Sequence, residues 1–295
     1  MRVSLHFHDS VHSSSSGDVA RILREELGAL LVDSATGQSL VESRADAVLR
    51  HMNRMADALS IRNLGGTPIQ FVTDVPKRRR KARKPVAVDA GFRVSLYDYR
   101  IWSAGEVATR PRHLHDICNF AVWCLFPGAK VALNARQIEA ARRTSVVARG
   151  SAAGSSNRSP EQDAISILDE GGLVALMTPD GTRQGDRKIG QGTVCDWFVF
   201  GHALFEGGLT GLEGLRGMVL PVCPESSSGW PASRTERRQM ADRRLSELIA
   251  NPDELRTNHM YQSADLDYVA RRIQTSEGSW QSFISATAPL AAPRL

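Results

Sequence analysis

Two histidines and a carboxylate stand directly ahead of a mainly apolar segment, and side chains of these types carry out acid–base chemistry. They are His113, His115 and Asp116, followed by residues 117–126. Histidine has an unperturbed pKa that suits proton removal from a hydroxyl near neutral pH, and a carboxylate on its other ring nitrogen fixes the tautomer. His113 and Asp116 are three positions apart and can face each other on a helix, whereas the adjacent His115 and Asp116 point apart. The pattern predicts His113 as a general base held by Asp116, with His115 as a second candidate.

The same segments also admit structural roles. Either histidine suits a surface or helix-capping position, and Cys118 and Cys124 are expected to face the core of an apolar helix rather than act as nucleophiles. His202 follows another apolar run and is interpreted as structural.

A second candidate for chemistry is the turn Pro179-Asp180-Gly181-Thr182-Arg183, which follows the apolar run 173–177. Glycines 171 and 172 bound that run on its other side, so it predicts a short buried strand. Backbone N–H groups around Gly181 and the guanidinium of Arg183 suit a phosphate, although a Pro/Asp/Gly turn is also a common way to end a strand. The predicted substrate-binding residues are Arg183, Gly181, Thr182, Asp180 and Arg149.

The order of these parts resembles the lysophospholipid and glycerolipid acyltransferase superfamily over about residues 113–223. The run Val146–Ser151 is similar to the second block of that family, an apolar strand that ends in or near Arg-Ser, and Val219–Val222 is similar to the fourth, a strand with an internal Pro. The third block of the family usually reads Pro-Glu-Gly-Thr-Arg. The first block of the family is His, four residues, Asp, and here Cys118 stands where the Asp is expected. The acid partner of His113 is then Asp116 or a residue from elsewhere in the chain.

This resemblance implies transfer of a fatty acyl group to the hydroxyl of a phosphorylated glycerol or lysophospholipid. The donor would be acyl-CoA or acyl carrier protein, and no further cofactor and no metal would be needed. Two alternatives remain open. One is an acyltransferase-like binding protein that has lost the relay, and the other is a nucleic-acid-binding protein.

The nucleic-acid alternative depends on the segment Lys77–Lys84, which holds seven cations in eight residues. Such a run repels itself and is expected to be a solvated linker. It would also be attracted to an anionic membrane surface. Nucleic acid is the least favoured partner because no aromatic side chain is interleaved for base stacking.

The chain of 295 residues, with a formal net charge of +5, predicts an α/β fold with a mixed, largely parallel sheet flanked by helices and a small helical N-terminal appendage. The expected regions are 1–75 (helical), 76–85 (basic linker), 86–230 (acyltransferase-like) and 231–295 (C-terminal helices). Expected helices are 17–31, 40–59, one that begins near 113–116 and continues through the apolar segment, 135–143, 159–171, 233–251 and 263–273. Expected strands are 69–72, 86–94, 95–99, 130–133, 144–148, 173–177 and 219–222.

Four cysteines without a CxxC pair favour a reducing compartment and argue against a metal knuckle. We see neither a membrane-spanning apolar run nor a secretory signal. The expected location is cytoplasmic, with peripheral attachment at the inner membrane surface as a further expectation.

Overall fold

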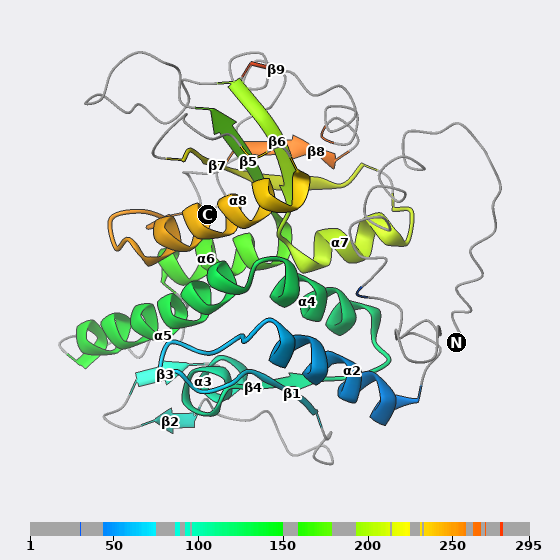
Figure 1. Ribbon diagram of the computed structural model, residues 1–295. Coiled ribbons are helices and arrows are strands. Elements are labelled where there is room, and N and C mark those ends of the chain that lie inside the picture. Colours follow the sequence, from blue (N-terminus) through cyan, green and yellow to red (C-terminus); the bar gives the residue numbers. More distant parts are fainter. Residues whose placement is uncertain are drawn as a thin grey trace.

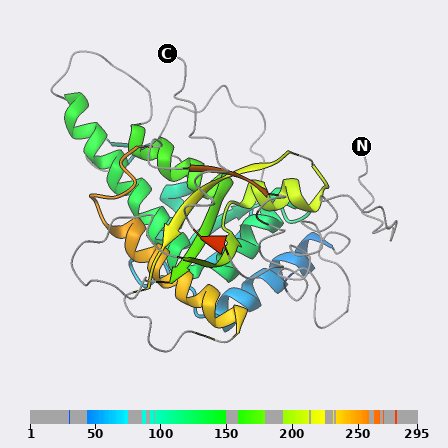
Figure 2. The same cartoon turned by 90° about the horizontal axis from the view of Figure 1, so that it is seen from above.

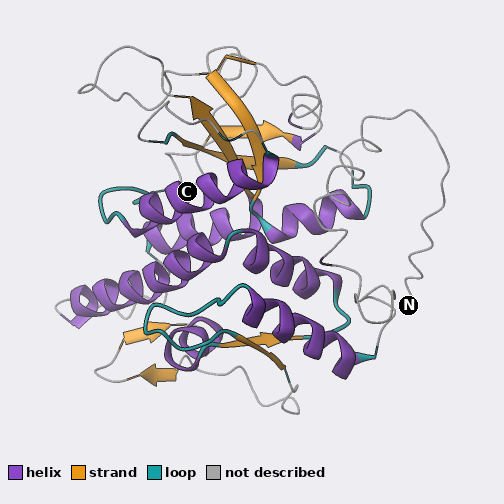
Figure 3. Ribbon diagram, in the orientation of Figure 1, coloured by secondary structure: helices purple, strands orange, loops and turns teal. Residues whose placement is uncertain are grey.

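The computed structural model describes residues 30, 44–74, 86–88, 92–94, 96–149, 159–178, 193–212, 214–224, 231, 233–257, 262–266, 269 and 278–279. Helices occupy the middle of the molecule, with the larger sheet on one side and two small strand pairs on the other (Figures 1 and 3). Viewed from above, the strands of the larger sheet lie over the helices (Figure 2). The α/β class expected from the sequence is confirmed.

The larger sheet has the strand order β8-β7-β5-β6-β9 within the described residues. Its central strand, β5, is buried along its apolar run and pairs in parallel with β7 and antiparallel with β6. A continuous apolar run is expected for a strand covered on both faces. The bounds are β5 Gly172–Thr178, β6 Thr193–Val199, β7 Arg216–Val222, β8 Gln262–Asp265 and β9 Gly278–Ser279.

The opposite side holds two strand pairs. Strands β1 (Gln70–Thr73) and β4 (Glu106–Thr109) are parallel, and β2 (Val86–Val88) and β3 (Phe92–Val94) are antiparallel. Strands β1 and β4 therefore pair with each other although the basic segment Lys77–Lys84 lies between them in the sequence. Helix α2 (Ala45–Ala58) buries Val48, Met52 and Ala56 in the same core as the rest of the described chain.

The strand expected at 95–99 is wrong, because helix α3 (Leu96–Ala104) begins there. Its aromatic residues resemble a strand by propensity. Tyr97 and Ile101, however, are four positions apart and both pack on the core, which is a helical spacing.

The strands expected at 130–133 and 144–148 are also wrong, because both lie in one long helix, α5 (Pro127–Arg149). Pro127 occupies the first helical position. The carboxylate of Asp242, on helix α8 (Arg234–Ala250), accepts hydrogen bonds from the backbone N–H groups of Gly128 (3.1 Å) and Ala129 (2.8 Å) and so caps α5. This cap comes from more than 100 residues away and leaves no local signal.

The helices expected at 159–171 and 233–251 are confirmed, and each begins with a capping box. Ser159 and Gln162 cap α6 (Pro160–Gly171), and Ser233 and Glu236 cap α8. The helix expected at 263–273 is wrong at its start, where β8 instead pairs with the edge of β7.

No single helix in the described part of the chain has both the length and the apolar composition to cross a membrane. Helix α4 (Leu114–Leu125) meets that test only together with part of α5, across a bend of 110°.

Candidate functional site

The start of α4 lies where the sequence predicted it, but the predicted relay is not formed. His113 is the exposed N-cap residue, with extended backbone (φ −92°, ψ 122°) and no side-chain capping bond. Asp116 instead accepts hydrogen bonds from Arg110, through its backbone N–H (2.6 Å), Nε (2.9 Å) and Nη2 (2.7 Å). The described residues show no hydrogen bond between His113 and Asp116, and the ring of His113 lies edge to face with that of His115, with 6.3 Å between the ring centroids.

Arg110 also sets the charge of Asp116. Burial acts to raise the pKa of this carboxyl, but hydrogen bonds and charge from Arg110 outweigh burial and hold the pKa below its ordinary value. Asp116 is therefore an ionised partner of an arginine.

The histidine that is paired with a carboxylate is His115. Its Nδ1 lies 2.9 Å from Oε2 of Glu206, on helix α7 (His202–Leu209). Its Nε2 lies 3.0 Å from Nε2 of His202, with the two rings edge to face. The acid partner thus comes from elsewhere in the chain, 91 residues away.

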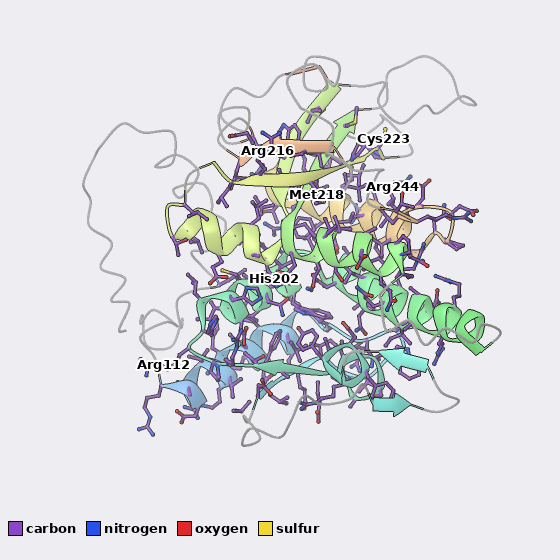
Figure 4. The ribbon with its side chains drawn as sticks, turned by 180° about the vertical axis from the view of Figure 1, so that it is seen from behind. Arg112, His202, Arg216, Met218, Cys223 and Arg244 are labelled. Atoms are coloured by element: carbon purple, nitrogen blue, oxygen red, sulfur yellow. The ribbon has the colours of Figure 1, made fainter. Side chains whose placement is uncertain are left out.

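His202 is the first residue of α7 and lies where that helix meets α4 (Figure 4). Burial lowers its pKa to about 4, so the ring is neutral at pH 7. Its Nε2 is 3.3 Å from Oε2 of Glu170, and its Nδ1 is 3.8 Å from Oδ1 of Asp169. Nδ1 is buried and has no hydrogen-bond partner among the described residues.

A glycine contact brings the start of α7 against the end of α6. The backbone N–H groups of Phe200 and Gly201 both donate to the carbonyl of Gly172, at 2.9 Å. A Cβ atom on Gly201 would lie 2.4 Å from the Gly172 nitrogen and 2.5 Å from the Glu170 carbonyl oxygen. Only glycine fits this approach, which places His202 beside Asp169 and Glu170.

A buried polar chain extends from Asp169 into the pocket. Lys130 Nζ donates to Oδ1 of Asp169 and to Oδ1 of Asn119 (2.9 Å), and Asn119 Nδ2 donates to Tyr97 Oη (2.8 Å). Burial acts to raise the pKa of Asp169, but the charge of Lys130 outweighs it and the pKa is lowered. Burial, with the charge of Asp169, raises the pKa of the neighbouring Glu170.

Tyr97, Asn119 and Asp169 of this polar chain line a cavity of about 470 Å³, formed by α3, β4, α4, α5, α6 and α7, and Asp116 with its partner Arg110 lines the same cavity. Its polar lining includes His115, Asn119, Gln137, Asp169, Glu170 and His202. The pocket therefore offers imidazole lone pairs, carboxylates and buried hydrogen-bond donors to a small polar molecule.

Residues 86–264 match the family model DUF3025, which is described as a protein of unknown function. The match covers more than half of the chain. The chain belongs to the DUF3025 family. All residues that line the pocket except Asp74 lie inside the matched span, and so does Glu206. No curated protein and no solved structure shows significant similarity to the chain.

Most of the predicted substrate-binding residues of this DUF3025 chain lie outside the described residues. They are Asp180, Gly181, Thr182 and Arg183. The basic segment Lys77–Lys84 also lies outside. The strand before the turn, β5, runs from Gly172, next to Glu170, to Thr178. At the rise per residue of a β-strand, Gly172 and Thr178 lie about 20 Å apart, so the end of β5 that leads into the turn is far from Glu170.

Arg149 ends a helix rather than the predicted strand. Along the axis of α5 it lies roughly 18 Å from Gln137, the pocket-lining residue of that helix closest to it, at 1.5 Å per residue. The structure therefore does not place the Arg149 backbone at the pocket.

Four residues of this site in the DUF3025 chain were not predicted from the sequence, and His202 was interpreted as structural. The four are Lys130, Asp169, Glu170 and Glu206. One feature of the sequence could have indicated part of this site. His202 and Glu206 are four positions apart on a short apolar helix, so both face one side of that helix. A titratable pair on an apolar helix predicts a buried polar site, although its partners could not be identified from spacing.

Proposed function

We propose that this protein is an enzyme that activates an oxygen nucleophile in the pocket between α4, α6 and α7. The observation that carries the proposal is the His115–Glu206 pair, in which a carboxylate holds Nδ1 at 2.9 Å. When Nδ1–H donates to Glu206, Nε2 carries a lone pair on the side of the ring that faces His202. That lone pair can accept a proton from a hydroxyl or bind a cation that acidifies the hydroxyl. Either route makes a water or a substrate hydroxyl a stronger nucleophile.

The reaction that fits this activation is attack on an acyl carbon. With water as the nucleophile the result is hydrolysis of an ester or thioester, and with a substrate hydroxyl it is acyl transfer. A polar cavity of about 470 Å³ suits a small polar acceptor. We therefore assign the pocket to the acceptor and to the reacting carbonyl.

The acyl-transfer form of the proposal keeps the substrates expected from the sequence. The donor is an acyl thioester, acyl-CoA or acyl carrier protein, and the acceptor is a phosphorylated glycerol or lysophospholipid. Attraction of Lys77–Lys84 to an anionic membrane would bring the enzyme to such an acceptor. These assignments rest on the resemblance of sequence blocks, whereas the activating pair rests on the pocket.

The test compares two histidines that are two residues apart. His115→Ala removes the pocket imidazole, and His113→Ala removes the exposed N-cap imidazole as a matched control. Thiol release from short- and long-chain acyl-CoA is measured with water, glycerol phosphate or lysophospholipid as acceptor, and nitrophenyl esters report hydrolysis.

We expect wild-type turnover with at least one donor, a loss of about 100-fold or more in His115→Ala, and an unchanged rate in His113→Ala. An active His115→Ala variant would refute the assignment, as would a folded wild type that is inactive with every donor. The second result would favour a binding protein.

A further inference from the structure

Three possible metal ligands converge at the meeting point of α4, α6 and α7. His115, Glu170 and His202 each offer one ligand atom, and these atoms all lie within 4.8 Å of one another. Nε2 of His202 is 3.0 Å from Nε2 of His115 and 3.3 Å from Oε2 of Glu170. The three side chains come from the first turn of α4, the last turn of α6 and the first residue of α7.

These separations are those of ligands that share one ion. Zinc–nitrogen and zinc–oxygen bonds of about 2.0–2.2 Å place neighbouring ligand atoms roughly 3.0–3.5 Å apart at bond angles of about 90–110°. Both measured separations lie in that range. The ligand atoms of the third pair, His115 and Glu170, lie within 4.8 Å of each other and would approach on binding a common ion.

The Nδ1 atoms of His115 and His202, on the other side of each ring from Nε2, support the same arrangement. Metal-bound histidines usually donate their other N–H to a carboxylate or carbonyl, which orients the ring. His115 has Glu206 in that position at 2.9 Å. For His202, Nδ1 is buried without a hydrogen-bond partner among the described residues, and the nearest carboxylate oxygen is Oδ1 of Asp169, at 3.8 Å.

We propose that His115, His202 and Glu170 bind one divalent transition-metal ion, with Zn²⁺ the best match. Two imidazoles and one carboxylate form a common ligand set of catalytic zinc, which keeps a fourth position for water or substrate. Asp169, Glu170 and Glu206 against Lys130 leave an excess of negative charge for a dication to offset.

This inference rests on the proposed function and specifies how the nucleophile is activated. A water on the open position loses a proton to solvent at a pKa near 7. The resulting hydroxide forms a bond to the acyl carbon, the bond from that carbon to oxygen or sulfur breaks, and the leaving group takes up a proton from solvent. A substrate hydroxyl at the same position gives acyl transfer instead.

The test measures metal binding by itself. Full-length protein is stripped with a chelator, and binding of Zn²⁺, Mn²⁺ and Fe²⁺ is followed by calorimetry and by metal analysis after dialysis. Co²⁺ binding is followed by its visible absorption. The variants are His202→Ala and Glu170→Gln, with His113→Ala as control, and circular dichroism checks that each is folded. Glu170 is half exposed, so its variant is expected to fold even if His202→Ala does not.

We expect one equivalent of Zn²⁺ in the wild type and in His113→Ala, and an affinity at least 100-fold weaker in both ligand variants. A wild type without stoichiometric binding would overturn the proposal, as would ligand variants that bind as well as the wild type.

The two proposals fail in different ways. Stoichiometric metal with no turnover on any substrate would remove the proposed reaction and leave the metal site. Turnover that survives chelation but is lost in His115→Ala would remove the metal site and leave the proposed function.

Discussion

Glu206 pairs with His115 and not with His113, through the Nδ1 atom of the His115 ring. His113 lies only two positions earlier but precedes the first helical turn, and its neighbour Asp116 is taken by Arg110. Sequence spacing predicted a histidine–carboxylate pair at His113 and Asp116, whereas the structure forms one at His115 and Glu206. It could not identify the acid, because Glu206 reaches the site from another helix.

Replacing Glu206 with Gln tests its role as a positioning residue. The amide oxygen can still accept from Nδ1–H, so the ring stays in place, but the negative charge that makes the imidazole more basic is lost. We expect kcat to fall about 10- to 100-fold, the range seen when carboxylates behind ligand histidines are changed, with KM within about twofold. Steady-state kinetics with a substrate of the wild-type enzyme measure kcat and KM separately.

The control for this change is Glu139→Gln on α5, where an exposed glutamate pairs with Arg143. It should leave kcat unaltered. A Glu206→Gln enzyme with the wild-type kcat would show that Glu206 only fills space.

Elements whose signals are local in the sequence could be predicted, whereas an element that depends on a distant contact could not. Helices α2, α6 and α8 and strands β1, β5 and β7 were predictable, because their apolar periodicity and, for α6 and α8, their capping boxes lie within the element itself. The single helix α5 was not, because its N-terminal cap is Asp242 of α8. Short runs such as 130–133 do not distinguish a strand from a buried helix.

The junction of α6, β5 and α7 gives a test with a matched pair of glycines. Gly201→Ala places a Cβ atom 2.4–2.5 Å from the backbone of residues 170–172, whereas a Cβ on Gly171 meets nothing within 4 Å. Because the backbone must move, we expect Gly201→Ala to lower the free energy of unfolding by about 1–3 kcal/mol and to weaken turnover and metal binding together. Gly171→Ala should resemble the wild type in turnover and metal binding.

Urea unfolding, followed by circular dichroism, measures the stability of both variants. A Gly201→Ala protein as stable and as active as the wild type would mean that the contact between α6 and α7 does not position His202.

At the scale of the molecule, the pocket exists because three helix ends meet. His115 and His202 are 87 residues apart in the chain, and His115 and Glu206 are 91 apart. The α/β class follows from the alternation of elements and could be predicted. The meeting point follows from the packing of α4 against α7 and of α6 against α7, which no spacing in the sequence specifies.

The most direct measurement of the central claim is X-ray absorption at the zinc edge of the metal-loaded protein. We predict a zinc ion bound by two imidazoles and by further oxygen ligands, with the oxygens at about 2.0–2.2 Å. The two imidazole rings should be visible as outer-shell scattering. One imidazole should disappear in His202→Ala and both should remain in His113→Ala. A spectrum with sulfur ligands, or one that does not change in His202→Ala, would contradict the account.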